Sequence, residues 1–364
     1  MNKKIAVLAG DGIGPEVMTE TLRILDVIAQ KFHHQFEYIE GKIGGQAYDD
    51  HQTHCPKQTL QICQQADAIL FGSVGGPVSE QQQPKWKNCE ANSILKLRQH
   101  FNLNINIRPV VVYPELAQLC PLKSEISQQG IDCVIFRELT GGIYFGRHEQ
   151  SVINGERQAF DDCTYREAQI QSIVRAAFKA AQSRCKKVCS VDKANVLATS
   201  KLWREIAEET SKEFPDVTLT HMLVDNCAMQ LVIHPQQFDV IVTENLFGDI
   251  ISDLAAALPG SLGLIPSASL NAQGLGLYEP SGGSAPDIAG KGIANPCAQI
   301  LSAAWMLNLS FGMITEAKMI ENAVKSTIAS GIVTADLSKT KAVTTSAFVD
   351  AVIRHLDVPP TSRD

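Results

Sequence analysis

The feature that most constrains the fold of this 364-residue chain is the alternation of short apolar runs with amphipathic helical patterns. Residues 4–9 predict a strand, and residues 15–32, whose apolar positions recur every three or four residues, predict the helix that follows. A second buried strand is predicted at 68–71 and ends in the glycine-rich run GSVGGP. Strands separated by helices form parallel sheets, so the sequence predicts an α/β architecture.

The same alternation continues through most of the chain. Further strands are predicted at 132–137, 187–191, 217–224 and 239–243, and further helices at 165–184, 200–213, 247–258, 298–308 and 314–331. Residues 259–296 are rich in Gly, Pro, Ser and Ala and lack periodicity, which predicts a functional loop. The last residues, 358–364, are expected to be frayed. This length predicts two packed domains.

Composition excludes several classes of function. The net charge of −7 argues against a nucleic-acid or anionic-membrane partner. No apolar run is long enough for a membrane span or a signal peptide, and the ten cysteines contain no CxxC pair. Reduced thiols, rather than disulfides or a zinc site, are therefore expected, and the protein is predicted to be cytosolic.

The motif GDGIGPE, at residues 10–16, resembles half of a dinucleotide-binding fingerprint at a strand-to-helix junction. The third glycine of that fingerprint is replaced by Pro15, which suits the first turn of a helix but not close helix–sheet contact. We therefore do not expect a Rossmann fold. The glycines still indicate a close approach of the backbone to another group, for which a ligand at the helix N-terminus is one candidate.

Two aspartates, Asp249 and Asp253, stand four residues apart in the apolar segment NLFGDIISDLAAAL, which predicts a largely buried helix. On one helix face, like charges repel by about 0.2–0.5 kcal/mol. The pair is either a solvated acidic face or a cation site, and all-oxygen ligands favour Mg²⁺ or Mn²⁺ over zinc. Asp225, between a strand and a helix, fits an N-cap and a metal ligand equally well.

Three arginines, Arg98, Arg108 and Arg137, lie in apolar or extended segments. Each one alone is typical of a structural ion pair, whereas the three together fit a substrate with two or three negative charges, because guanidinium groups bind carboxylates well. Lys193, after a strand, is a candidate proton acceptor, and Tyr144, on a glycine-flanked turn, is a candidate proton donor.

Taken together, the motifs GDGIGPE, LRQHFNLNINIRP, FRELTGGIYFG, VDKANVL, NLFGDIISD and EPSGGSAPDIAGKGIANP closely resemble the β-decarboxylating dehydrogenases, the family of isocitrate and 3-isopropylmalate dehydrogenases. The resemblance covers nearly the whole chain. It implies that the three arginines hold the substrate carboxylates and that the three aspartates bind Mg²⁺ or Mn²⁺, with Asp225 also contacting the substrate. It further implies that Lys193 accepts the hydroxyl proton during hydride transfer, and that Tyr144 protonates the enol left by loss of CO₂.

The resemblance also implies the cofactor. Asp287 would accept hydrogen bonds from the adenosine ribose and repel a 2′-phosphate, so NAD is expected rather than NADP. Relatives that use NADP place a lysine and a tyrosine at the positions of Asp287 and Ile288. Among the residues implied to contact NAD, Glu90 resembles a glutamate on the nicotinamide side of the site, and Asn295 resembles the residue that contacts adenine. The full set is Gly75, Gly76, Pro77, Glu90, Asn195, Gly283, Ser284, Ala285, Pro286, Asp287, Ile288 and Asn295.

The substrate prediction depends on Ile94 and Leu95, which precede Arg98. Isocitrate enzymes carry a serine and an asparagine there, whereas this apolar pair would shelter an isopropyl group and leave a third carboxylate unsolvated. The expected substrate is 3-isopropylmalate, in leucine biosynthesis. The alternatives are D-malate or tartrate and homoisocitrate within the family, and a non-catalytic regulatory subunit.

The fold implied is that of the isocitrate/isopropylmalate dehydrogenases, two α/β domains around an extended, twisted mixed sheet with the active site in the cleft between them. A discontinuous cofactor-binding domain would comprise residues 1–103 and 259–364. Residues 104–258 would form the domain for dimerisation, metal and substrate. The family builds each site from two subunits, so Lys193 and Asp225 would serve the partner's site in an obligatory homodimer.

Overall fold

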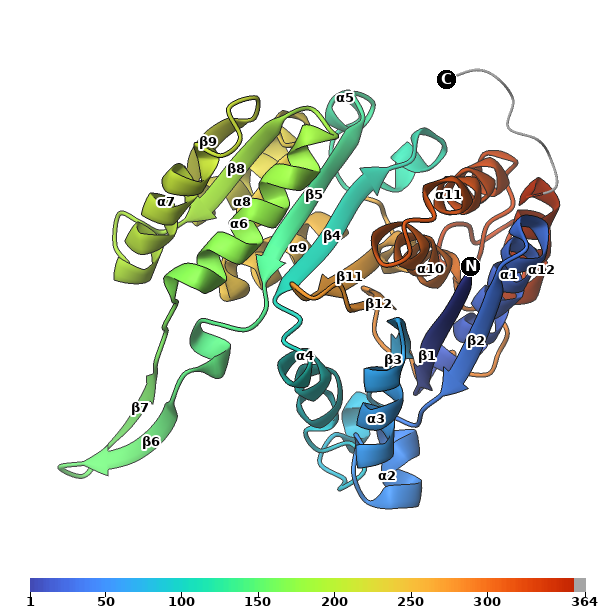
Figure 1. Cartoon of the computed structure of the whole chain (residues 1–364), viewed down its shortest axis with the longest axis horizontal. Coiled ribbons are helices and arrows are strands. Elements are labelled where there is room, and N and C mark those ends of the chain that lie inside the picture. Colours follow the sequence, from blue (N-terminus) through green and yellow to red (C-terminus); the bar gives the residue numbers. More distant parts are fainter. Residues whose placement is uncertain (357–364) are drawn as a thin grey trace. The chain divides into compact units, whose positions relative to one another are not determined.

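The computed structural model describes residues 1–356 and divides the chain into two compact units. The first comprises Met1–Phe101 and Pro259–Asp364, and the second comprises Asn102–Leu258. Both are α/β units in which helices cover a largely parallel sheet (Figure 1). Within residues 1–356, no helix is both long and apolar enough to cross a membrane.

The first unit is built on five strands in the order β2-β1-β3-β12-β11. Strands β1 (Asn2–Gly10), β2 (Gln35–Glu40) and β3 (Ala68–Ser73) are parallel, as is β12 (Gly276–Pro280) with β3, while β11 (Pro266–Leu270) pairs antiparallel with β12. Every residue of β3 is buried, as expected for a central strand covered on both faces.

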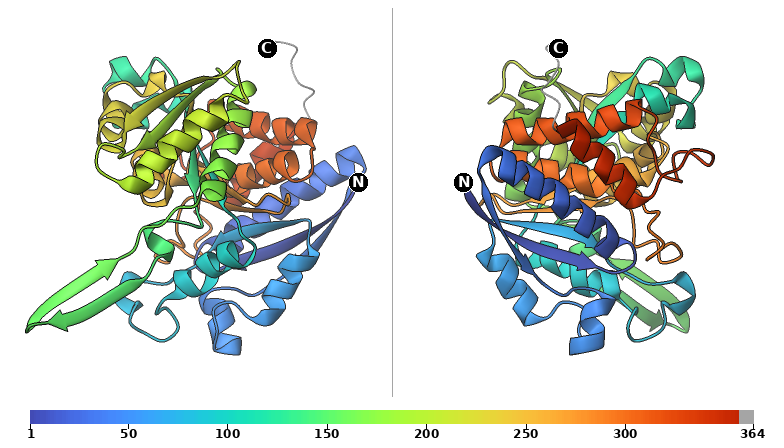
Figure 2. Two further views of the ribbon diagram at one scale, coloured as in Figure 1. Left: turned by 60° about the vertical axis from the view of Figure 1, so that its left-hand side comes forward. Right: turned by 90° about the vertical axis from the view of Figure 1, so that its right-hand side faces the viewer.

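Helices cover both faces of this first sheet (Figure 2). Helices α1 (Gly14–Phe32), α10 (Cys297–Leu309), α11 (Ile314–Ala329) and α12 (Thr345–Leu356) form one layer, while α2 (Gly45–His51) and α3 (Lys57–Gln65) pack beside β1. Helix α4 (Lys96–His100) continues a short π-helical turn at Ala91–Leu95. π-Helical turns often occur at functional sites.

The second unit has five strands in the order β4-β5-β10-β8-β9. Strand β4 (Ile105–Val112) is antiparallel to β5 (Ile131–Glu138), and β5, β10 (Val240–Thr243), β8 (Lys187–Asp192) and β9 (Thr218–Leu223) are parallel. Helices α6 (Glu167–Gln182) and α7 (Ala198–Ser211) cover one face, and α8 (Val224–Ile233) and α9 (Asn245–Ala256) cover the other (Figure 1). Short α5 (Ser124–Ser127) precedes β5.

A separate antiparallel ribbon extends from the second unit. It consists of β6 (His148–Ile153) and β7 (Glu156–Asp161), and it lies away from the sheet of that unit (Figure 2). Almost all of its residues are exposed, including the apolar side chains Val152, Ile153 and Phe160.

Two parts of the sequence prediction were wrong. Residues 259–296 are not one irregular loop, because they contain the β11–β12 hairpin. The small side chains of the β11 sequence PSASL let α10 pack against it closely, and this buried strand therefore lacks the large apolar residues that usually reveal a strand. A third C-terminal helix, α12, was also missed. The predicted frayed tail lies outside the described residues.

The glycines of the GDGIGPE motif let the chain approach itself. A Cβ atom added to Gly12, whose φ is +60°, would lie 1.9 Å from the carbonyl oxygen of Ser284. That same oxygen accepts a hydrogen bond of 2.8 Å from the Ile13 N–H. The close approach expected from these glycines is therefore met by backbone of the same unit.

We expect Gly12→Ala to lower the free energy of unfolding by about 3 kcal/mol, because it adds a steric overlap to the cost of a left-handed alanine. Gly312→Ala is the matched control. Gly312 also has a positive φ, of +67°, but no atom lies within 4 Å of its added Cβ. The control should cost only about 1 kcal/mol in urea denaturation. Equal destabilisation by the two variants would contradict the steric explanation.

Candidate active site

Asp249 lies at the centre of a polar cluster in the second unit. It belongs to α9, whose first turn is capped by Glu244, since the Glu244 carboxylate accepts a 2.7 Å hydrogen bond from the Phe247 N–H. The Asp249 side chain is 37% exposed and that of Asp253, one turn later, is 70% exposed. The prediction of a largely buried helix was therefore wrong for this face, where Ile250 is also exposed.

Arg137, at the end of β5, is the buried cation of this cluster. Its Nε and Nη2 donate to Asn245 Oδ1 at 3.0 and 2.9 Å, and its Nη1 pairs with Asp249 Oδ1. Gly248 makes room for the arginine, because a Cβ there would lie 2.6 Å from Arg137 Cγ. Asn245 and Gly248 position Arg137. Neither was predicted from the sequence, although both belong to the segment NLFGDIISDLAAAL, which also contains the two aspartates.

Tyr144 contacts the same carboxylate. Its hydroxyl donates to Asp249 Oδ2 at 3.0 Å, and the Arg137 guanidinium lies 5.9 Å from the centre of its ring. Partial burial, together with the charge of Asp249, raises the pKa of the Tyr144 phenol. The hydroxyl therefore keeps its proton at neutral pH, as a proton donor must.

Arg108 pairs with the second aspartate of α9. Its Nη1 donates to Ser252 Oγ at 3.0 Å and to Asp253 Oδ1 at 2.8 Å, while its Nε is buried without a hydrogen-bond partner in the described part of the chain. In the β4–β5 register, Asn106 lies opposite Arg137, so Arg108 and Arg137 share one face of the sheet as diagonal neighbours. Two cations thus face two carboxylates.

Lys193 and Asp225 form a separate ion pair. Lys193 follows β8, and its Nζ pairs with Oδ1 of Asp225. Asp225 is the second residue of α8, whose N-cap is Leu223, so the N-cap interpretation of Asp225 was wrong. The hydrogen bond from Lys193 lowers the pKa of Asp225. Asn195 lies exposed in the turn after Lys193.

The aspartates do not meet as a metal site within one chain. Among residues 1–356, no group of three or more His, Cys, Asp or Glu side chains is placed to hold a metal ion. Asp249 and Asp253 share one face of α9, whereas Asp225 is paired with Lys193 on α8. The described residues of this chain therefore do not bring the three aspartates together.

In the first unit, the structure brings together three of the residues predicted to contact the cofactor. An added Cβ at Gly75 would lie 3.8 Å from both Glu90 Oε1 and Ser284 Oγ. Gly76 lies against the ring of Trp86, because a Cβ atom added to Gly76 would lie 2.3 Å from Trp86 Cδ2. Pro77 follows Gly76 in the chain. A Cβ at Gly283 would meet no atom within 4 Å, so bare backbone borders open space there.

The segment after Gly283 reaches the surface at Asp287. Ser284 is buried, Ala285 has a φ of +38°, and Pro286 and Asp287 are exposed, followed by the partly exposed Ile288. Asn295 is held inside this unit, because its Nδ2 donates to Asp336 at 2.9 Å and its Oδ1 accepts from the Cys297 N–H at 3.0 Å.

The π-helical turn and α4 present the residues predicted to select the substrate. Leu95 is 37% exposed, whereas Ile94 is only 8% exposed and packs inside the unit. Arg98 is buried, and its Nη2 donates to Glu279 Oε1 at 2.9 Å. The Nε of Arg98 has no partner among the described residues. Glu279 was not anticipated from the sequence.

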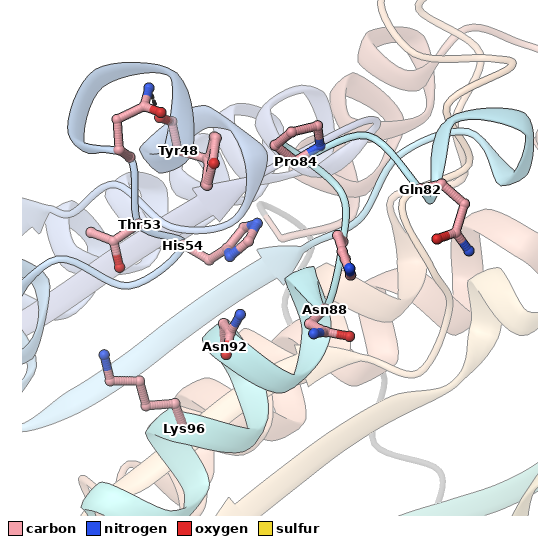
Figure 3. Close-up of a pocket in the computed structure, with 10 residues that line it drawn as sticks. Tyr48, Thr53, His54, Gln82, Pro84, Asn88, Asn92 and Lys96 are labelled. Carbon is pink, nitrogen blue, oxygen red and sulfur yellow. Dashed lines mark hydrogen bonds between the residues drawn. The ribbon is translucent and has the colours of Figure 1, made fainter.

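A polar cavity of about 580 Å³ also lies in the first unit (Figure 3). Figure 3 shows Asn88, Asn92 and Lys96 along one segment, with Thr53 and His54 facing them. None of the predicted site residues lines this cavity. The chemistry predicted from the sequence is therefore located elsewhere.

Comparison with known proteins identifies the family of this chain. The isocitrate/isopropylmalate dehydrogenase family matches residues 4–352. A 3-isopropylmalate dehydrogenase from Geobacillus kaustophilus is 52% identical over 96% of this chain and 95% of its own length, and one from Shouchella clausii is 52% identical over all of both chains. A crystal structure of isocitrate dehydrogenase from Methylococcus capsulatus superposes with a TM-score of 0.84 at 35% identity, covering 97% of this chain and 99% of that one. The resemblance in the motifs and the predicted fold class are confirmed, and the chain belongs to the isocitrate/isopropylmalate dehydrogenase family.

Proposed function

We propose that this protein uses NAD and a divalent metal to convert (2R,3S)-3-isopropylmalate to 4-methyl-2-oxopentanoate and CO₂, a step of leucine biosynthesis. Relatives named 3-isopropylmalate dehydrogenase that are 51–52% identical over nearly the full chain support this reaction. The observation that carries the chemistry is the Arg137–Asp249–Tyr144 cluster, which joins a cation, a carboxylate and a protonated phenol.

The three arginines are proposed to bind the carboxylates of the substrate. Arg108 and Arg137 already hold carboxylates of α9, and Arg98 holds Glu279, so each guanidinium lies in a setting that fits an anion. Arg98 and Arg108 each keep a buried Nε without a partner in the described chain. A substrate carboxylate would satisfy such donors, which are costly to leave unpaired.

Mg²⁺ or Mn²⁺ is proposed to bind Asp249, Asp253 and the partner subunit's Asp225. The fit rests on the donor set, since carboxylate oxygens suit these hard cations and the two α9 side chains share one partly exposed face. When bound, the metal would polarise the hydroxyl and carbonyl oxygens of the substrate as a Lewis acid. Asp225 would also contact the substrate.

Lys193 and Tyr144 are proposed to move the protons. Lys193, as the partner subunit's Lys193, would accept the proton of the substrate hydroxyl while hydride passes to the nicotinamide. Tyr144 would donate its proton to C3 after CO₂ has left. The raised pKa of Tyr144 supports the second role, because the phenol is protonated before the step begins.

NAD is proposed to bind along Gly75–Pro77, Glu90, Asn195, Gly283–Ile288 and Asn295. The fit rests on the first unit, where Gly75 faces Glu90 and Ser284, and the bare backbone of Gly283 borders open space. The exposed carboxylate of Asp287 is available for the ribose hydroxyls and would repel a 2′-phosphate. This charge favours NAD over NADP.

A homodimer is proposed to complete each site. Helices α8 and α9 pack on each other and leave Met229, Val232, Ile233 and Ile250 exposed. Such clustered apolar side chains on a folded surface are typical of protein–protein interfaces. The same two helices carry Asp225 and Asp249, so a dimer through this face would bring carboxylates of two chains together.

The reaction is tested by NADH formation with Mg²⁺ and with a chelator, using 3-isopropylmalate, D-malate and isocitrate. We expect metal-dependent activity with the highest kcat/KM for 3-isopropylmalate. A preference for isocitrate would contradict the substrate assignment, and no activity with any of these acids would favour a regulatory subunit.

Leu95→Ser should lower kcat/KM for 3-isopropylmalate by about 10- to 200-fold, because the exposed Leu95 side chain would no longer shelter the isopropyl group. D-Malate is the matched control substrate, since it lacks that group, and its kcat/KM should change much less. An equal loss with both substrates would show that Leu95 does not select the side chain.

Asp249→Asn should lower kcat at least about a hundredfold and raise the Mg²⁺ concentration needed for activity, because the proposed metal loses one of its charged ligands. Asp132→Asn is the matched control, since Asp132 lies on β5 and pairs with Arg184 at 2.7 Å, far along the strand from Arg137. The control should stay within about twofold of the wild type. Near-wild-type turnover of the Asp249 variant at low Mg²⁺ would refute the metal assignment.

A further inference from the structure

The two acidic residues of GDGIGPE, Asp11 and Glu16, hold other backbone segments of the unit through hydrogen bonds. The glycine pattern of the motif does not predict these contacts. Asp11 is buried, and its carboxylate accepts three backbone N–H groups, from Gly45 at 2.8 Å, Gln46 at 2.9 Å and Gly75 at 3.0 Å. The Cys89 thiol lies 3.9 Å from the same carboxylate. One anion thus joins the start of α2 to the Gly75 loop.

Asp11 therefore sets the position of the segment proposed to meet the nicotinamide end of NAD. Gly75 is the residue that faces Glu90 and Ser284. The backbone of Asp11 is itself fixed, because its N–H donates to the Ser73 carbonyl at 2.6 Å and its carbonyl accepts from the Ser73 hydroxyl at 2.8 Å. The anchor is rigid, and the loop that it holds is rich in glycine.

Glu16, in the first turn of α1, holds a second segment in the same way. Its carboxylate accepts the N–H of Ala294 at 3.1 Å and that of Gly292 at 3.3 Å, together with the Thr345 hydroxyl at 2.5 Å. Gly292 and Ala294 lie just before Asn295, which is proposed to lie at the adenine end of NAD. Glu16 thus anchors the segment between Asp287 and Asn295.

We propose that Asp11 and Glu16 are positioning residues for NAD binding, with Asp11 shaping the nicotinamide end of the site and Glu16 the adenosine end. This inference rests on the proposed function. A carboxylate is needed at both positions, because both of its oxygens accept N–H groups: Asp11 Oδ1 from Gln46 and Oδ2 from Gly45 and Gly75, and Glu16 Oε1 from Ala294 and Oε2 from Gly292. Asparagine or glutamine would turn an amide NH₂ toward an N–H donor.

The test is the dissociation constant of the purified protein for NADH and for ADP-ribose, which lacks the nicotinamide. We expect Asp11→Asn to weaken NADH binding about tenfold and leave ADP-ribose binding unchanged. Glu16→Gln should weaken both ligands by a similar factor.

Asp67→Asn is the matched control. Asp67 also accepts a backbone N–H, from Lys4 at 2.8 Å, but it holds neither loop. A variant that lowers the melting temperature without changing either dissociation constant would overturn the positioning role, and so would an equal loss of ADP-ribose binding in the Asp11 variant. If Asp11→Asn does not fold, Glu16→Gln still tests the inference at the segment between Asp287 and Asn295. Weaker binding of both ligands by this variant would support the positioning role, and unchanged binding of both would overturn it. Failure of the wild-type protein to bind NADH would instead refute the proposed function.

Discussion

The ion pair between Arg137 and Asp249 is the interaction on which the polar cluster of the second unit depends. It joins the end of β5 to α9, and it is possible only because Gly248 leaves space for the arginine and Asn245 fixes the orientation of its guanidinium. Tyr144 donates to the same carboxylate, so one aspartate positions both a guanidinium and a phenol. An arginine closing a buried strand would be costly without these partners.

In the first unit, carboxylates rather than a guanidinium join separate segments of the chain. The carboxylates of buried Asp11 and partly buried Glu16 hold glycine-containing segments in place by accepting hydrogen bonds from their backbone N–H groups. The glycines of GDGIGPE let the backbone of Ser73 and Ser284 approach closely, and the two acids of the motif accept hydrogen bonds from other loops of the same unit. A motif that resembles a phosphate-binding loop is therefore the internal framework of one unit.

Much of the fold could be predicted from periodicity, because strands such as β3 and helices such as α1 bury large apolar residues at regular spacing. Strand β11 could not, since its small residues fit against α10 only in the assembled unit. The arginines and aspartates of the candidate site could be identified from the sequence, because they stand in apolar or extended segments. The residues that these side chains contact could not be identified, because contacts between distant segments leave no pattern in one sequence. They are Asn245, Gly248 and Glu279. Similarly, Ile94 and Leu95 were treated alike, and only packing separates the buried residue from the exposed one.

The central claim is that each active site combines α9 carboxylates of one chain with Lys193 of another. Two inactive variants, Lys193→Met and Asp249→Asn, test it most directly when they are unfolded together, refolded and assayed for NADH formation. Each hybrid dimer would hold one site with both residues intact, so activity should reappear in the mixture while either variant alone stays inactive. A mixture as inactive as its separate components, although hybrid dimers are present, would contradict the account.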